Sequence, residues 1–172
     1  MDILLIDSEL TLALQLIVAV LLGIVLGAER AIAGKTAGMR TYALVSMGSC
    51  LFVIISTVVT KSLLGLTGVD PLRVVAGIVT GVGFIGAGLI IFKETSVRGL
   101  TTAAGLWVAA GVGVAVGYKL YIIALFSVTL TVFIFTILWF IENKIKFFSY
   151  NDNGKDTTEI VSEENETVNK LS

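Results

Sequence analysis

Residues 10–28 read LTLALQLIVAVLLGIVLGA, an apolar run without a single charged side chain. A helix of about 20 apolar residues is long enough to span the roughly 30 Å hydrocarbon core of a bilayer. Four further uncharged runs of similar length follow, at residues 41–60, 74–92, 99–118 and 120–141. Because 56% of the 172 residues are hydrophobic and only 15% are charged, a water-soluble domain is excluded. The sequence predicts an all-α integral membrane bundle of about five transmembrane helices.

Charge divides the chain into two parts. The formal net charge is −1, but residues 151–172 carry six acidic side chains against two lysines. This tail also has few large apolar groups, so it cannot bury enough surface to offset the entropy lost on folding. We therefore expect a transmembrane domain over residues 1–150 and an acidic, disordered tail over residues 151–172. A solvated end is the simpler interpretation of the tail, and an interaction segment is the alternative.

Lysine and arginine gather on one side of the predicted helices. The links on the other side hold only Lys61, Arg73 and Lys119. Since positively charged links stay in the cytoplasm, the richer side is expected to be cytoplasmic, with the N-terminus outside and the tail inside. The seven residues of the richer side are Arg30, Lys35, Arg40, Lys93, Arg98, Lys144 and Lys146.

The sequence offers little for catalysis or metal binding. It contains no histidine, and its one cysteine, Cys50, lies in an apolar run and is expected to be a small buried hydrophobe. No nucleophile–base pair is recognisable, so we predict no enzyme activity and no cofactor. Glu29 and Asp70 fall on opposite sides of the membrane in this topology, so they cannot share one Mg²⁺ ion. The sequence therefore shows no clear ligand set for magnesium, and whether the protein binds this metal stays open.

Small residues recur at every fourth position in three of the runs, a pattern that lets helix backbones approach closely in lipid. We interpret these residues as packing faces. The run at 120–141 has no glycine, so it is expected to face lipid or a partner subunit, and we predict a homo-oligomer with a dimer favoured. The small residues are Ala19, Gly23 and Gly27 in the first run, Gly77 and Gly81 in the third, and Thr101, Gly105, Ala109, Gly113 and Gly117 in the fourth.

The third run is denser in glycine than one packing face requires. Gly81, Gly83, Gly86 and Gly88 fall within a short segment, although each glycine costs about 1 kcal/mol relative to alanine in a helix interior. Two interpretations stay open. The segment either crosses another helix very closely, which we favour, or is locally unwound and exposes backbone carbonyls to a ligand, as in the broken helices of transporters.

Polar side chains near the predicted helix ends are the candidate functional residues. Asp70 also fits a helix N-cap, because Pro71 follows it. Glu29 and Arg30 could simply form an interfacial ion pair. The full candidate set is Glu29, Arg30, Arg40, Thr41, Asp70, Arg73, Arg98, Thr101 and Thr102.

Four of these residues suggest an anion site. The links before the second and fourth helices each carry a lysine and an arginine five residues apart, so the two hairpins could be a parallel repeat. Glu29, Arg30, Arg40 and Arg98 would then meet at the cytoplasmic end beside two helix N-termini. Arginines and helix N-termini favour anions. We hypothesise that this end binds a phosphate-like group, a lipid headgroup or an acidic patch on a partner; ordinary positive-inside anchoring is the alternative.

Several motifs occur together and in order along the chain. They are LGAER at residues 26–30, GKTAGMRT at 34–41, DPLR at 70–73, GFIGAG at 83–88, and RGLTTAA at 98–104 followed by Trp107. In these motifs the chain closely resembles the membrane domain of the MgtC/SapB family of bacterial proteins. The resemblance implies a five-helix protein of the bacterial inner membrane. It also implies that the candidate polar residues, which lie in or beside these motifs, are important for function.

The resemblance also implies a function. Members of the family are associated with growth in low magnesium, and the best-known member resembles a regulator that restrains the F-type ATP synthase. Virulence-type members carry an ACT-like domain after the fifth helix, whereas about thirty residues follow residue 141 here, so we expect the shorter SapB-like branch. We predict a regulatory protein, linked to magnesium limitation or membrane energetics, that binds a membrane partner and no nucleic acid. The alternative is a transporter of a small solute or of an ion, linked to Mg²⁺.

Overall fold

The computed structural model describes residues 2–62, 70, 72–93, 96–142 and 144–145. The tail over residues 151–172 lies outside this part of the chain, so its predicted disorder stays a prediction. The chain divides into two compact units, Met1–Val132 and Phe133–Ser172, and each is described by itself.

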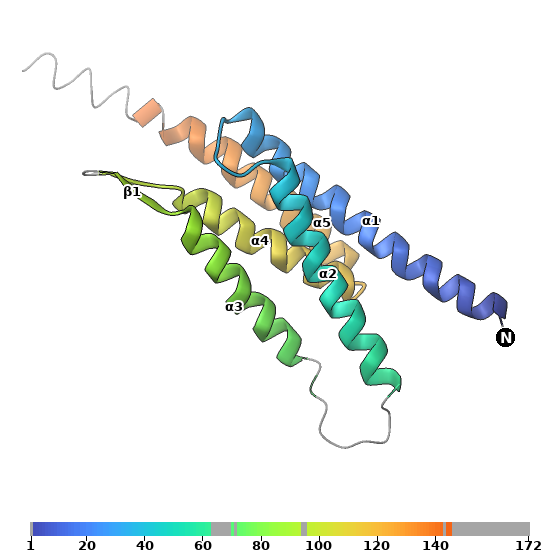
Figure 1. The fold of residues 1–172 in the computed structure, drawn as a ribbon. Coiled ribbons are helices and arrows are strands. Elements are labelled where there is room, and N and C mark those ends of the chain that lie inside the picture. Colours follow the sequence, from blue (N-terminus) through green and yellow to red (C-terminus); the bar gives the residue numbers. More distant parts are fainter. Residues whose placement is uncertain (1, 63–69, 71, 94–95, 143, 146–172) are drawn as a thin grey trace, which may run out of the picture. The chain divides into compact units, whose positions relative to one another are not determined.

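Helices dominate the described residues (Figure 1). They are α1 (Asp2–Ile32), α2 (Met39–Ser62), α3 (Leu72–Leu89), α4 (Leu100–Gly117) and α5 (Tyr121–Phe133), and a π-helical segment, Ile134–Leu138, follows α5. Five stretches are long and apolar enough to cross a membrane: Glu9–Ile32, Met39–Thr60, Leu72–Leu89, Leu100–Gly117 and Tyr121–Glu142. The predicted all-α membrane fold is therefore confirmed.

A short β-hairpin between α3 and α4 was not predicted from the sequence. Strand β1 (Ile91–Lys93) pairs with β2 (Ser96–Arg98) in antiparallel register, with Phe92 opposite Val97. The third apolar run extends to residue 92, but helix α3 ends at Leu89, because the chain enters the hairpin there. In Figure 1 the hairpin extends from the shared end of α3 and α4.

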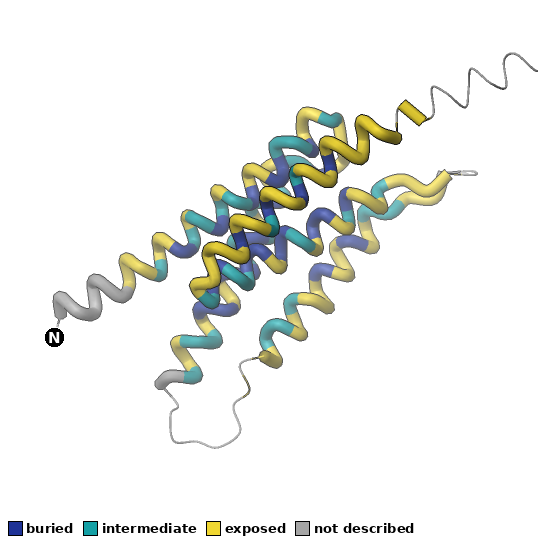
Figure 2. The backbone as a smooth tube through the Cα atoms, turned by 180° about the vertical axis from the view of Figure 1, so that it is seen from behind, coloured by how far each residue is buried: buried dark blue, intermediate teal, exposed yellow. Residues whose placement is uncertain are grey.

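Helix α4 is the most buried element of the first unit. It contacts α1, α2 and α3, and half of its residues are buried. The core includes Leu26 of α1, Tyr42 of α2 and Leu106 of α4. Figure 2 shows the buried positions along the inner faces of the helices. The outward faces are rich in exposed leucine, isoleucine and phenylalanine, as expected for helices surrounded by lipid.

Glycine sets the distance between helices at the core. A Cβ atom built on Gly23 would lie 2.7 Å from Ala43 Cα of α2, and one built on Gly27 would lie 2.5 Å from Met39 Cα. A Cβ atom on Gly113 of α4 would collide with the carbonyl oxygen of Ser46. Gly23 and Gly27 of α1 and Gly113 of α4 therefore pack against α2 as the spacing predicted, since any side chain there would push the backbones apart.

The glycine-rich segment of α3 differs from both interpretations of the sequence. Helix α3 is α-helical over its whole length, Leu72–Leu89, so the unwound alternative is wrong. Gly81, Gly83 and Gly88 have nothing within 4 Å of an added Cβ atom, and only Gly86 meets a neighbour, Ala103 of α4, at 3.5 Å. Close packing inside the chain thus holds at one glycine of the four, because the others lie on the faces of α3 that turn away from α4.

Candidate functional site

Glu29 and Arg30 form an ion pair at the end of α1. The Nε atom of Arg30 donates a hydrogen bond to Oε2 of Glu29. The Arg30 side chain is only 3% exposed, whereas that of Glu29 is 20% exposed. Burying a guanidinium group is costly unless a carboxylate compensates it. The predicted ion pair is present, but it lies within the end of the bundle and not on its surface.

The link between α1 and α2 begins just after this ion pair with a tight turn. The amide of Gly34 donates to the carbonyl of Ala31 at 3.1 Å, and the amide of Lys35 donates to that of Arg30 at 3.0 Å. Gly34 has a φ of 64°, so these bonds make a Schellman cap in which glycine takes the left-handed position. Ala37 is buried beyond the cap. The turn therefore ends α1 just after the charged pair.

Tyr42 connects the beginnings of α2 and α4 beside this pair. Its hydroxyl donates a hydrogen bond to the backbone carbonyl of Thr102 at 3.2 Å, and both residues are buried. The phenol also lies within electrostatic range of Arg30 and Glu29. We call Glu29, Arg30, Tyr42 and Thr102 the buried polar cluster, since it joins the end of α1 to the beginnings of α2 and α4.

The other candidates lie outside this cluster. Arg40, Arg98 and Thr101 are exposed, and Thr41 is half-buried. Within the part of the chain that the structure describes, no hydrogen bond or ion pair joins Arg40 or Arg98 to the cluster. The hypothesised anion site loses Arg30, because this side chain is buried against Glu29.

Asp70 and Arg73 belong to the beginning of α3. The Asp70 carboxylate accepts a hydrogen bond from the amide of Leu72 at 2.9 Å, and the Asp70 carbonyl accepts one from the amide of Arg73 at 3.2 Å. Asp70 therefore acts as the N-cap that its position predicted. Among the residues described, no three His, Cys, Asp or Glu side chains gather closely enough to hold a metal ion.

Sequence reasoning missed several buried polar residues, namely Gln15, Tyr42, Ser46, Ser49 and Thr131. The Nε2 atom of Gln15 donates to the carbonyls of Val116 at 3.0 Å and Gly117 at 3.3 Å, so it caps the C-terminus of α4. Within the described part of the chain, Gln15 Oε1 and Ser46 Oγ are buried without a hydrogen-bond partner. A lone amide inside an uncharged run was a usable signal for Gln15, because polar groups are costly at that depth.

Comparison with known proteins supports the resemblance in the motifs. A model of the MgtC family matches residues 16–144, which include the whole buried polar cluster. The chain belongs to the MgtC family. Its five apolar helices and this membership make it a multi-pass membrane protein.

Three relatives illustrate how far the similarity extends. "Putative magnesium transporter YhiD" of Escherichia coli K12 is 40% identical over 123 residues, which are 70% of this chain and 57% of YhiD. "Protein MgtC" of Salmonella typhimurium LT2 is 43% identical over 91 residues, 53% of this chain and 36% of MgtC. "Protein SrpB" of Synechococcus elongatus is 41% identical over 104 residues, 55% of this chain and 57% of SrpB.

The chain spans about half the length, or less, of these curated relatives. No solved structure matches it significantly.

Proposed function

We propose that this protein is a regulator in the bacterial inner membrane that acts by binding a membrane partner under magnesium limitation. The single observation that carries this proposal is the closure of the bundle formed by α1, α2 and α4. These helices meet at backbone-to-backbone contacts, so one chain has little room between them for a solute path. Binding through the outer faces of the helices is the activity that such a bundle supports best.

The contacts at the glycines support this closure. Gly23 and Gly27 of α1 lie against the backbone of α2, and Gly113 of α4 lies against the Ser46 carbonyl. The charged groups nearest the core are also engaged within the chain, because Glu29 pairs with Arg30. Neither group is placed to accompany an ion through the bundle.

The link to magnesium comes from relatives. The Escherichia coli relative carries the name "Putative magnesium transporter YhiD", and the family resemblance adds growth in low magnesium and the F-type ATP synthase as a partner. We extend these to this chain as part of the proposal. The orientation with the Arg30 end in the cytoplasm belongs to it as well.

The proposal is tested in a Salmonella typhimurium strain that lacks its own MgtC. Expression of this chain should restore growth in low magnesium, and crosslinking in those cells should capture membrane subunits of the F-type ATP synthase or another membrane complex. Purified protein in liposomes containing a magnesium-sensitive dye should give no flux above empty liposomes. Growth rescue without any captured complex would contradict regulation by partner binding.

Transport is the second candidate, favoured by the name of YhiD. Because one chain is closed at the glycine contacts, a pathway would have to lie between subunits. Saturable Mg²⁺ uptake by the proteoliposomes would establish this function in place of the first.

A further inference from the structure

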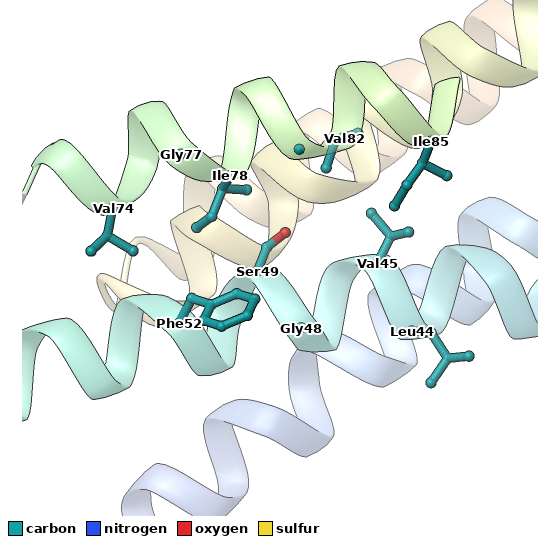
Figure 3. A pocket seen from close by; sticks show the side chains of 11 residues that line it. Leu44, Val45, Gly48, Ser49, Phe52, Val74, Gly77, Ile78, Val82 and Ile85 are labelled. Carbon is teal, nitrogen blue, oxygen red and sulfur yellow. The ribbon is translucent and has the colours of Figure 1, made fainter. Parts of the chain in front are cut away.

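A groove of about 620 Å³ lies between α2 and α3. Its volume falls within the roughly 300–1,000 Å³ of small-molecule sites. Figure 3 shows the side chains of the two helices that face each other across it. Apart from Ser49 and the glycines Gly48, Gly77 and Gly81, its lining is valine, leucine, isoleucine and phenylalanine.

The groove exists because α3 packs against α4 and contacts α2 less extensively. Gly86 of α3 meets Ala103 of α4 at 3.5 Å from an added Cβ atom. Across the groove, Gly48 of α2 and Gly77 and Gly81 of α3 have nothing within 4 Å of an added Cβ atom. Backbone atoms therefore form part of the walls, and the space they leave is not filled by this chain.

Ser49 places one hydroxyl group on the floor of this groove. Figure 3 shows its Oγ atom directed from α2 toward the α3 side of the groove. Ser49 is 4% exposed, and its Oγ atom is not among the fully enclosed, unpartnered side-chain atoms of the described residues, which are Gln15 Oε1 and Ser46 Oγ. A hydroxyl that faces an apolar groove is stabilised by a hydrogen-bond partner there, so the Ser49 hydroxyl favours an occupant with a polar atom.

Four threonines of α2, α3 and α5 satisfy their hydroxyl groups locally. Thr57, Thr80, Thr129 and Thr131 each donate to the carbonyl four residues earlier, at 2.8, 2.9, 2.9 and 2.7 Å. Such back-bonding is the usual solution for Ser and Thr in a helix. Ser49 does not adopt it and directs its hydroxyl into the groove. Ser46, three residues earlier on α2, also lacks a partner but does not line the groove, so the position of Ser49 in the lining is what distinguishes it.

The depth of Ser49 limits the chemistry of the occupant. Ser49 lies near the middle of the span Met39–Thr60, about 15 Å along the helix from either end. A phospholipid headgroup or a carboxylate would not stay charged and unpaired at that depth. The occupant must therefore be neutral there and present an oxygen that accepts a hydrogen bond from the hydroxyl.

The shape of the groove argues against a transmembrane helix as the occupant. The rim residues Leu44, Phe52 and Ile85 are 63%, 57% and 44% exposed, whereas Ser49 on the floor is 4% exposed. A helix about 10 Å wide would rest on that rim. A slender or planar group can reach between the glycine backbones to the hydroxyl.

We propose that this groove binds one neutral long-chain lipid carrying a carbonyl oxygen, the chemistry of an isoprenoid quinone or a long-chain ketone. The carbonyl accepts a hydrogen bond from Ser49, the polar end lies against Gly48, Gly77 and Gly81, and the chain follows the apolar walls. This inference does not depend on the proposed regulatory function.

Photolabelling in nanodiscs tests this assignment. The probe is a photoreactive azido-quinone with a long alkyl chain, competed with an unlabelled long-chain quinone or methyl ketone. Labelling should be saturable and should map to α2 and α3 around the groove. Competition by quinone alone identifies a quinone site, and competition by both compounds identifies selection for the carbonyl chain.

Three variants locate the site. Gly77→Leu fills the groove and should abolish saturable labelling. Gly83→Leu is the matched control, because Gly83 is equally open on the same helix but does not line the groove, and it should label as the parent does. Ser49→Ala should weaken labelling roughly 3- to 10-fold, as expected for one lost hydrogen bond.

Three results would overturn the proposal. The first is unsaturable labelling, or equal labelling by a phosphatidylcholine with a photoreactive acyl chain, which would mean ordinary lipid contact. The second is unchanged labelling in Ser49→Ala. The third is a fall in oligomer mass in Gly77→Leu with quinone labelling intact, which would mean that a helix of a second copy occupies the groove.

Discussion

At the scale of single residues, the buried polar cluster is the least replaceable feature of the fold. Arg30 is almost completely buried and is held by Glu29, and Tyr42 ties α2 to the backbone of α4. A charge or hydroxyl left without its partner inside a protein costs more than the intact interaction contributes. Changes that remove one partner should therefore be more damaging than the modest net energy of each bond suggests.

Glu29→Gln should destabilise the protein by about 3 kcal/mol, because it removes the carboxylate that pairs with the buried Arg30 guanidinium. Thermal unfolding in mild detergent measures the effect. Glu142→Gln serves as the control, since Glu142 is exposed, and should unfold like the parent. Equal stability of both variants would show that the ion pair contributes nothing.

Tyr42→Phe should cost about 1 kcal/mol, because it deletes the hydroxyl that donates to Thr102 and changes little else. Tyr121→Phe, at an exposed position, is the comparison and should be nearly neutral. The same unfolding measurement applies. A larger loss for Tyr121→Phe than for Tyr42→Phe would contradict the assigned hydrogen bond.

At the scale of elements, the helices of the first unit are arranged by where glycine brings backbones together and where it does not. Gly113 lies against the Ser46 carbonyl, whereas Gly111, two residues earlier on α4, has nothing within 4 Å of an added Cβ atom. Two glycines on one helix thus differ in role: Gly113 allows close packing against α2, whereas Gly111 makes no such contact. The α3 glycines resemble Gly111 more than Gly113, which leaves the groove beside α2 open.

Gly113→Ala should destabilise the protein by about 2 kcal/mol or more, since the new methyl group forces α2 and α4 apart. Gly111→Ala should be neutral or stabilising by up to about 1 kcal/mol, because alanine favours the helix and meets no neighbour there. Thermal unfolding of the two variants side by side measures the difference. The opposite order of stability would refute the assigned contact between α2 and α4.

At the scale of the whole molecule, orientation and assembly stay predictions. The lysine and arginine distribution predicts that the link between α1 and α2 lies in the cytoplasm. The homo-oligomer predicted from the glycine-free fifth helix can be checked by a detergent-corrected mass, which should be a multiple of 18.2 kDa. A mass of one chain in mild detergent would count against assembly.

Orientation is measured by labelling intact cells with a membrane-impermeant maleimide. Thr36→Cys lies in the exposed link after α1, and Leu120→Cys lies in the link between α4 and α5. Leu120→Cys should react and Thr36→Cys should react only after the cells are opened. The native Cys50 is buried and provides the background. The reverse pattern would invert the topology.

The sequence by itself determined the class of the protein, its five spans and its family. These follow from local properties: an uncharged run of about 20 residues has one stable environment, Asp70 before Pro71 caps a helix, and ordered motifs such as LGAER and RGLTTAA are visible without any contact. The ion pair of Glu29 with Arg30 was also predictable, because the two residues are neighbours along the chain.

Only the tertiary structure decided which faces meet. The sequence could not tell the closely packed Gly113 from the open Gly81, because both are small residues at the same spacing. It also could not show that Tyr42 reaches Thr102, sixty residues away, that Arg30 is buried and not exposed beside Arg98, or that Ser49 faces an open groove. The physical reason is that the burial and the hydrogen-bond partners of a side chain depend on how helices distant in sequence pack together. The spacing of small residues along one helix does not show which helix packs against it.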